Sequence, residues 1–487
     1  MRAMMRMLAG VGLAAGLAAC AGSPATETAA GGAPKARVDG GVIVGAMEGD
    51  IAEFKGVPFA APPVGQLRWK PPQKVVAWSG EKQATAFGAS CPQSSRLGAE
   101  NKTSEDCLYL NVYQPKGAKA APVMVWIHGG SNLNGSGSIY NGAAFAKDGI
   151  VFVTVNYRMG GLGFFAHPEI TKAAAKDEPL ANYGLMDQTA ALQWVQKNIG
   201  QFGGDPKRVT VFGESAGAID IYALLGLKTS KGLFSQAILE SNITWGDSAS
   251  LSAAEADGKK LAVKAGASET ATLAELRAIP AEKFVTARGG DAEFPMVDGR
   301  FMTETSLQAV ANKHHVDVPL IVGTNSHEAT LIASRAPKET WTQWTNSQAG
   351  APARFIAAKS ADGAPSWLYF FSYVATDQRA TAFGAGHASE IAYVYGGQSR
   401  PPGAAVQPGA PPRAEPTVED KAMASLMHSC WVAFAKTGEP KCASGPAWPK
   451  YSAASDQLME FGTPSGVRTN FRKAELDAAT AAEAGAR

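Results

Sequence analysis

The 487-residue chain lacks the features that mark nucleic-acid-binding, membrane-spanning and metal-binding proteins. Its 45 Lys and Arg against 43 Asp and Glu give a formal charge of only +2, with no basic block, so we expect no nucleic acid partner. Beyond the first twenty residues no window holds about 18 uninterrupted apolar residues, so no transmembrane helix is expected. No His-x-x-x-His or Cys-x-x-Cys spacing occurs, which disfavours a metal site. A hydrophobic fraction of 45% with 18% charged residues is that of a globular protein.

Cysteine is also scarce: the chain has five, an odd number, and is long enough to fold without disulfides. The first of them, Cys20, ends the segment MRAMMRMLAGVGLAAGLAAC, which begins with positive charges at Arg2 and Arg6. The apolar run of about a dozen residues is too short to span a bilayer but suits a secretion signal. Its ending, Leu-Ala-Ala-Cys, resembles the lipobox of bacterial lipoproteins, in which the cysteine becomes the lipid-bearing N-terminus.

We therefore expect residues 1–19 to be a lipoprotein signal peptide and Cys20 to carry lipid. The protein would then be exported as a periplasmic or cell-envelope lipoprotein of a bacterium, attached to a membrane surface. The alternative is an ordinary signal peptide cut at the same small residues, which would release the protein. Residues 20–37 have almost no large apolar side chain and are expected to be a flexible tether. Removing residues 1–19 removes two Arg and no acid, so the mature chain is formally neutral.

The rest of the chain, residues 38–487, alternates between apolar runs and amphipathic segments and is expected to form a single domain. An antiparallel hairpin is expected around Glu48-Gly49-Asp50, and helices are expected over 185–199 and after Ser215. The Pro-rich residues 400–416 are expected to be a surface loop. Continuous apolar runs are typical of central strands in a mostly parallel sheet, and they lie at 122–127, 150–155, 208–213, 235–240, 318–323 and 367–374. The pattern predicts an α/β fold with helices on both faces of the sheet.

The most specific motif is Gly213-Glu214-Ser215-Ala216-Gly217, which lies between an expected strand and an expected helix. In that setting G-x-S-x-G forms a sharp turn that exposes a serine hydroxyl above the sheet. Serine is a weak nucleophile and needs a histidine base, which an acid must orient. In α/β-hydrolases these residues follow the chain order Ser, Asp or Glu, His. The alternative is a glycine-rich turn with an ordinary surface serine.

Seven sequence blocks in the same order identify a resemblance to the type-B carboxylesterases, the α/β-hydrolase family that includes the cholinesterases. The resemblance extends from about Val38 to Phe461. The blocks are FKGVPFAAPPVGQLRWKPP (54–72), EDCLYLNVY (105–113), HGG (128–130), NYRMGGLGFF (156–165), NYGLMDQTAALQWVQKNIGQFGGDP (182–206), VFGESAG (211–217) and AGHASEIAYVYG (385–396). It implies an α/β-hydrolase fold and hydrolysis of carboxylic esters through an acyl-enzyme, with no cofactor.

The resemblance also implies a catalytic triad of Ser215, Glu328 and His387. Glu328 follows an expected strand in VPLIVGTNSHEAT, although the family has Gly where this chain has Ala329. His428 also comes after Glu328, but it lies in an expected helix, where a packed histidine is the better interpretation.

The family's oxyanion hole, formed by backbone N–H groups, corresponds here to Gly130, Ser131 and Ala216. The family motif has Gly or Ala where this chain has Ser131. Ser241 matches a family position where a buried serine supports the histidine, but an ordinary strand-end serine is nearly as good an interpretation.

The remaining cysteines are expected to form two disulfides. Cys91 and Cys107 match a family disulfide, and Cys430 and Cys442 are close enough in sequence to make the second pair. The 91–107 loop has no Trp, the residue that cholinesterases use to hold a quaternary ammonium group, so choline esters are disfavoured.

Small-molecule esters are the expected substrates. Only 59 positions separate Glu328 from His387, fewer than is usual in the family, which predicts a more open acyl entrance. A lipase, a polyester hydrolase or a transacylase would use the same triad and stays an alternative. A catalytically silent binding module is a further alternative.

Overall fold

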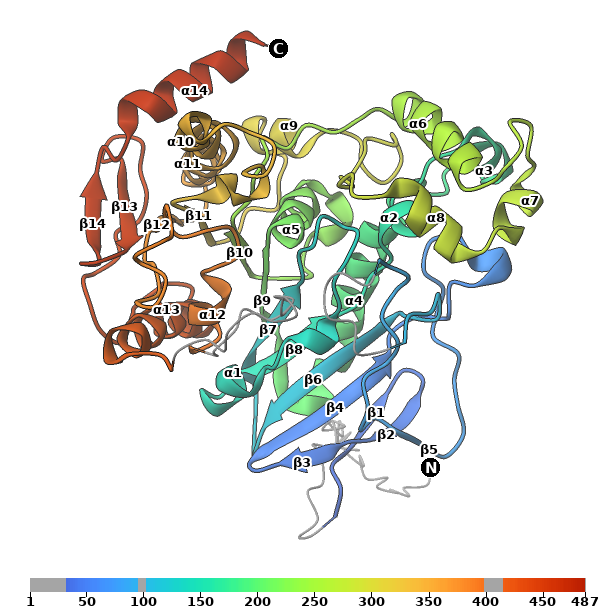
Figure 1. Ribbon diagram of the computed structural model, residues 1–487. Coiled ribbons are helices and arrows are strands. Elements are labelled where there is room, and N and C mark those ends of the chain that lie inside the picture. Colours follow the sequence, from blue (N-terminus) through green and yellow to red (C-terminus); the bar gives the residue numbers. More distant parts are fainter. Residues whose placement is uncertain (1–31, 95–101, 398–414, 487) are drawn as a thin grey trace, which may run out of the picture.

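The computed structural model describes residues 32–94, 102–397 and 415–486 (Figure 1). The expected signal peptide and the lipidation site at Cys20 lie outside these residues. So do most of the expected tether and nearly all of the expected Pro-rich loop.

The fold is built on one twisted sheet of eleven strands, parallel from β8 to β13 and antiparallel at both edges. All six apolar runs form strands of its parallel part, and the predicted hairpin is formed by β3 and β4. In spatial order the strands are β14 (Gly466–Thr469), β13 (Gln457–Phe461), β12 (Ser366–Phe371), β11 (Leu320–Asn325), β10 (Gln236–Glu240), β9 (Gly204–Glu214), β7 (Ala121–Ile127), β8 (Val151–Val155), β6 (Tyr109–Pro115), β4 (Ile51–Pro58) and β3 (Ala46–Glu48).

A small second sheet corrects the expected start of the folded part. Strand β1 (Lys35–Val38) pairs with β2 (Gly41–Val44), which pairs in turn with β5 (Glu81–Gln83). Residues 35–37 therefore belong to a strand and not to the tether. The segment has few large side chains, but Ala36 and Val38 alternate inward and are buried, and backbone pairing needs no large side chain.

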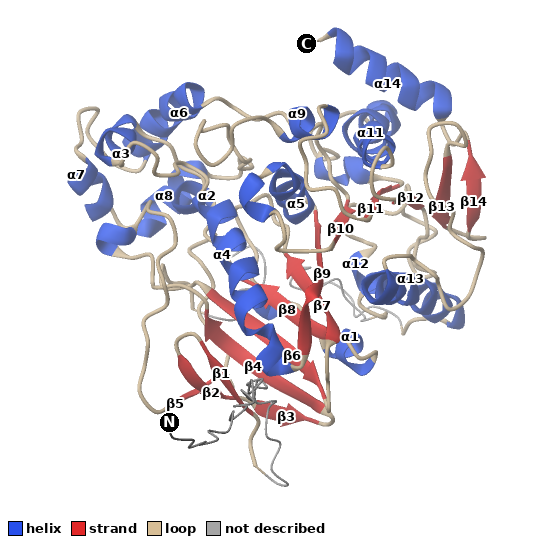
Figure 2. Ribbon diagram, turned by 180° about the vertical axis from the view of Figure 1, so that it is seen from behind, coloured by secondary structure: helices blue, strands red, loops and turns tan. Residues whose placement is uncertain are grey.

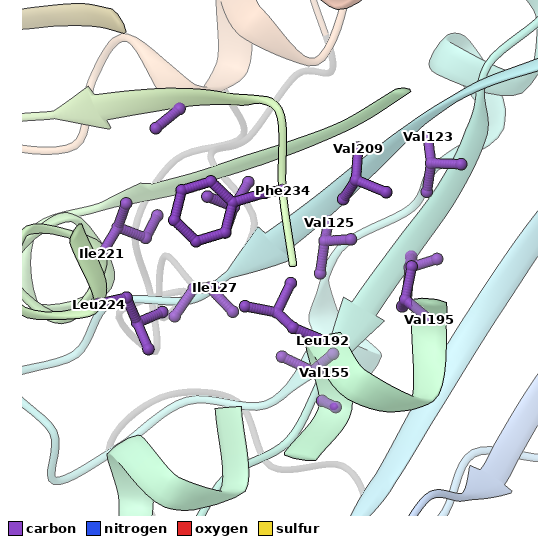
Figure 3. Close-up of a cluster of buried hydrophobic side chains, with 14 of the residues drawn as sticks. Val123, Val125, Ile127, Val155, Leu192, Val195, Val209, Ile221, Leu224 and Phe234 are labelled. Carbon is purple, nitrogen blue, oxygen red and sulfur yellow. The ribbon is translucent and has the colours of Figure 1, made fainter. Parts of the chain in front are cut away.

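Both faces of the sheet are covered, as predicted, because residues along each central strand alternate between two cores. On β7, Val123, Val125 and Ile127 pack under α4 (Tyr183–Asn198) and α5 (Ala216–Gly226), as Figure 3 shows. Met124 and Trp126 face the opposite side. That side is covered by α1 (Ala143–Lys147), α12 (Ile391–Val394) and α13 (Val418–Thr437). Figure 2 shows α4 lying along the sheet.

The remaining helices gather at the end of the sheet where the parallel strands finish (Figure 1). The full set of remaining helices is α2 (Gly160–Gly163), α3 (Pro168–Ala173), α6 (Leu251–Lys264), α7 (Leu273–Ala278), α8 (Ala281–Arg288), α9 (Ser306–Ala311), α10 (Trp341–Thr345), α11 (Ala351–Ser360) and α14 (Lys473–Gly485). Several of them pack around a third buried cluster that includes Trp69 and Phe284. Within the described ranges, no helix is both long enough and apolar enough to cross a membrane.

Candidate active site

Ser215 lies in the tight turn that joins β9 to α5. Its backbone has φ 57° and ψ −124°, a conformation that non-glycine residues rarely adopt. The turn is held by close backbone packing: a Cβ atom on Gly213 or Gly217 would overlap the carbonyl oxygen of Ile127. The Ser215 N–H also donates to the Glu240 carbonyl, 3.0 Å away on β10. The strained conformation is therefore imposed by the neighbouring strands.

The acid and the base that the resemblance implies lie in direct contact. Glu328 follows β11 in the short helix Glu328–Leu331, and its Oε2 lies 2.6 Å from Nδ1 of His387, in the connection between β12 and α12. The Glu328 Oε1 atom accepts hydrogen bonds from the Asn325 N–H at 2.6 Å and the Thr324 hydroxyl at 2.9 Å. Burial alone would raise the pKa of Glu328, but the charge of His387 and the hydrogen bonds with His387 and the Asn325 N–H hold it below its ordinary value.

A second carboxylate lies on the other side of the imidazole. Nε2 of His387 is 3.1 Å from Oε1 of Glu214, the residue before Ser215. In the part of the chain that the structure describes, no hydrogen bond joins Ser215 to His387. Burial alone would lower the pKa of His387, but the charges of Glu214 and Glu328 outweigh that effect and raise it. In this resting arrangement a carboxylate lies against each imidazole nitrogen.

A further buried acid, Glu390, lies close to Glu328 and His387. Glu390, three residues after His387, accepts a hydrogen bond from the Ser241 hydroxyl at 2.9 Å and another from the Asn325 amide. Burial and the charge of Glu328 raise the pKa of Glu390 to about 7. Ser241 thus contacts an acid beside the histidine and not the histidine itself.

Sequence reasoning missed Glu214 and Glu390 as members of the site. A signal for both was available, because they lie inside the G-E-S-A-G and H-x-x-E-I motifs.

The glycine loop after β7 lies against Ser215. A Cβ atom on Gly129 would come within 3.0 Å of the Ser215 Cβ. The Gly130 carbonyl accepts from two N–H groups of the loop itself, and the Ser131 carbonyl accepts from Glu293. Within the described residues, by contrast, the N–H groups of Gly130 and Ser131 have no acceptor, and the Ala216 N–H begins α5, where no intrahelical acceptor exists. These three N–H groups are thus not taken up by other acceptors in this part of the chain.

The structure contains both predicted disulfides, Cys91–Cys107 and Cys430–Cys442. They indicate maturation in an oxidising compartment. Gln93, two residues after Cys91, exchanges two hydrogen bonds with the backbone of Gly135, five residues beyond Gly130. The first disulfide therefore supports the end of the glycine loop.

The other histidine considered as a base, His428, is packed within α13, as predicted. Its ring nitrogens contact the Val394 carbonyl at 2.6 Å and Asp148 at 2.9 Å. It lines a cavity of about 1010 Å³ between α13 and the segment 384–397. None of Ser215, Glu328 and His387 is among the described residues that line this cavity, so catalysis is not assigned to it. The described residues hold no cluster of three His, Cys, Asp or Glu side chains suited to a metal ion.

Comparison with known proteins agrees with this geometry. The model of the carboxylesterase family matches residues 32–351 and 339–479. The fumonisin B1 esterase of Sphingopyxis macrogoltabida is 35% identical over 469 residues, which cover 86% of this chain and 85% of that protein. The para-nitrobenzyl esterase of Bacillus subtilis is 35% identical over 475 residues, covering 86% and 93%.

Solved structures give the same result. A thermophilic para-nitrobenzyl esterase superposes with a TM-score of 0.81 at 30% identity, covering 91% of this chain and 99% of the other. The EST55 carboxylesterase of Geobacillus stearothermophilus superposes with a TM-score of 0.79 at 31% identity over the same shares. This chain therefore belongs to the carboxylesterase family, has the α/β-hydrolase fold and is a carboxylic-ester hydrolase.

Proposed function

We propose that the protein hydrolyses esters through an acyl-enzyme formed on Ser215, with His387 as general base and Glu328 as its orienting acid. Oγ of Ser215 attacks the ester carbonyl carbon, and Nε2 of His387 takes the hydroxyl proton. The tetrahedral intermediate collapses when His387 returns that proton to the departing alkoxide. The alcohol leaves, and the acyl group stays bonded to the serine.

Water completes the cycle by the same path. His387 takes a proton from the water, whose oxygen attacks the acyl carbon, and then returns the proton to Ser215 as the carboxylic acid leaves. General-base assistance of this kind contributes about 10²–10⁴ in rate. The oxyanion formed in both steps would be stabilised by the N–H groups of Gly130, Ser131 and Ala216, and loss of one such donor costs about 3–4 kcal/mol.

The observation that carries the proposal is the 2.6 Å contact between Glu328 and Nδ1 of His387. This contact places the proton on Nδ1 and leaves Nε2 as the atom that exchanges protons. In the resting structure Nε2 faces Glu214, so the attack requires the imidazole to turn from that carboxylate toward the serine hydroxyl.

Uncharged small esters are the substrate class that we propose. The relatives named above act on a para-nitrobenzyl ester and on fumonisin B1 according to their names, which supports a small-molecule ester as the substrate. The short interval between Glu328 and His387 supports an open acyl entrance. A lipase, a polyester hydrolase or a transacylase would use the same triad, and each is an alternative to this proposal.

The test combines labelling with a substrate panel. A fluorophosphonate probe should label the wild-type protein and not the Ser215→Ala variant. That variant should lose on the order of 10⁵–10⁶ in kcat on para-nitrophenyl esters. Comparable rates across acetyl, butyryl and octanoyl esters would support the open entrance, and strict acetyl selectivity would contradict it. Labelling that persists in the alanine variant would overturn the assignment of the nucleophile.

The N-terminal lipobox resemblance leads to a separate proposal, that Cys20 is lipidated and holds the enzyme at a membrane surface of the bacterial cell envelope. Wild-type protein expressed in a bacterium should partition with membranes and release a lipid-modified N-terminal peptide, whereas Cys20→Ala should not. Recovery of unmodified, soluble wild-type protein would favour an ordinary signal peptide.

A further inference from the structure

Two consecutive residues of the glycine loop, Ser131 and Asn132, have left-handed backbones, with φ of 60° and 56°. Non-glycine residues avoid this conformation, so neighbouring groups must hold them in it. The Ser131 carbonyl accepts from the Glu293 N–H at 3.0 Å, and the Asn132 carbonyl accepts from the Gly160 N–H at 2.7 Å. The backbone of the loop is thus attached to the start of α2 at Gly160 and to the segment after α8 at Glu293.

The side chain of Asn132 adds a third attachment, and it leads to the helix of the nucleophile. Its Nδ2 donates to Oδ1 of Asp220 at 3.0 Å and to the Glu293 carbonyl at 3.2 Å. Its Oδ1 lies 3.1 Å from the hydroxyl of Tyr157. Both N–H groups of the amide therefore have an acceptor, which determines its orientation, while the Tyr157 hydroxyl lies between Oδ1 of Asn132 and the His128 carbonyl, 2.6 Å away.

Asp220 lies five residues after Ser215 on α5, and Gln188 of α4 donates to its other carboxylate oxygen. Asn132, Asp220 and Gln188 are all fully buried. The N–H of Ala216 begins the same helix that carries Asp220. The pair therefore joins the two separate sources of oxyanion donors, the glycine loop and the first turn of α5.

We propose that Asn132 and Asp220 form a buried amide–carboxylate pair that positions the oxyanion-hole N–H groups of Gly130 and Ser131 relative to Ala216. Neither side chain touches the substrate, so both are positioning residues. The inference rests on the proposed acyl-enzyme mechanism. Loosening the pair should displace donors that act mainly on the transition state, so kcat should fall while KM changes little.

An exchange of the two side chains tests the pair. Asn132→Asp places two carboxylates face to face, and Asp220→Asn places two amide groups face to face. The first should lower kcat roughly 100-fold and the second roughly 10-fold. The double exchange restores the donor and the acceptor. If the two single losses were independent, they would multiply; we expect the kcat of the double variant to be higher than that product predicts by about tenfold or more. An exchange that shows no such recovery would overturn the proposal.

Asn132→Gly keeps a residue suited to the left-handed backbone and removes only the amide, so it remains informative if Asn132→Asp does not fold. Its kcat, and its affinity for a trifluoromethyl ketone that forms a tetrahedral adduct with the serine, should fall together by about tenfold, with KM nearly constant. Unchanged kcat and ketone affinity would contradict the pair's role. Asn198→Gly is the control. This buried amide, at the end of α4, accepts from the Asp39 N–H and donates to the Trp194 carbonyl, and its loss should lower Tm without changing kcat.

Failure of this inference is distinguishable from failure of the proposed function. A wild-type protein that is not labelled by the fluorophosphonate would contradict the mechanism itself. A wild-type protein that is labelled and active, with variants at Asn132 and Asp220 that are equally active, would contradict only the positioning role.

Discussion

The turn that carries Ser215 and the segment that carries His387 are held in place by different forces. The turn is confined by backbone atoms of β7, which leave no room for a Cβ on either flanking glycine. The His387 segment is held mainly by polar contacts: Glu328 and Glu214 on its ring, and the Thr330 hydroxyl, which accepts from its N–H at 3.0 Å. Ser215 is thus placed by steric exclusion and His387 by electrostatics.

This difference has a chemical purpose. A nucleophile needs one fixed position, which close packing provides at every pH. A base must change its charge and turn its ring during each cycle, so contacts that respond to charge suit it better than packing does. Substitutions near the serine should therefore act on folding and geometry, whereas substitutions near the histidine should act on protonation.

The largest effect is expected from Gly217→Ala. The added Cβ would overlap the backbone of Ile127 and His128, where no flexible side chain can move aside. We expect a loss of about 3 kcal/mol or more in unfolding free energy, or an insoluble protein. Thermal melting checks this, with Gly200→Ala as control because its Cβ would meet nothing within 4 Å. A Gly217→Ala enzyme with wild-type Tm and kcat would show that packing does not fix the turn.

Glu328→Gln should keep the fold and lose activity. The amide would still accept from Asn325 and Thr324 through its oxygen but would present N–H groups to Nδ1, which favours the wrong imidazole tautomer. We expect kcat to fall by about 10³–10⁴, with Tm changed little.

Glu240→Gln is a matched control for that variant. This acid is also buried, and burial raises its pKa well above the ordinary value, so its neutral form is favoured and the amide resembles it. It accepts from the Trp431 ring N–H at 2.7 Å. Equal losses in the two variants would show that any buried acid here supports activity through folding alone.

Glu214→Gln should move the pH profile. The charge of Glu214 raises the pKa of His387, so its removal lowers that pKa, and the neutral imidazole persists to lower pH. The acidic limb of kcat/KM should shift to lower pH by about one unit. Glu390→Gln should shift it in the same direction by less, because the effect of Glu390 on the pKa of His387 is smaller. A limb that stays in place or moves to higher pH would contradict electrostatic control of the base.

The smallest effect is expected from Phe383→Ala, which tests whether packing contributes at all to the His387 segment. Phe383 is half-exposed, and its ring lies 4.9 Å from His327 and 5.6 Å from Trp341. We expect a loss of about 1 kcal/mol in stability and less than about threefold in kcat. Val418→Ala, at a strongly exposed position on α13, is the control. A loss in kcat as large as that of Glu328→Gln would show that packing contributes more than electrostatics to the position of the His387 segment.

Much of the fold could be predicted because it depends on local pattern. Continuous apolar runs mark strands buried on both faces, and all six were found in the sheet. Strand β1 was missed because its pairing uses backbone groups, and Ala36 is too small to reveal a buried position.

The chain order Ser215, Glu328, His387 could also be predicted, and the contact of the last two agrees with it. The position of Glu214 against Nε2 could not, since it depends on how one ring is rotated between the end of β9 and the short helix at Glu328. The Asn132–Asp220 contact was equally hidden, because 88 residues separate two polar side chains that only the packed fold brings together.

The disulfide between Cys91 and Cys107 links the structure near the glycine loop to the redox environment of the protein. The segment that it closes is paired through Gln93 to Gly135, at the far end of the glycine loop. Under reducing conditions that closure would be absent, and the segment that carries Gln93 would be less firmly held beside the glycine loop. Oxidation closes the disulfide and completes this support. The support of the glycine loop therefore depends in part on an oxidising environment.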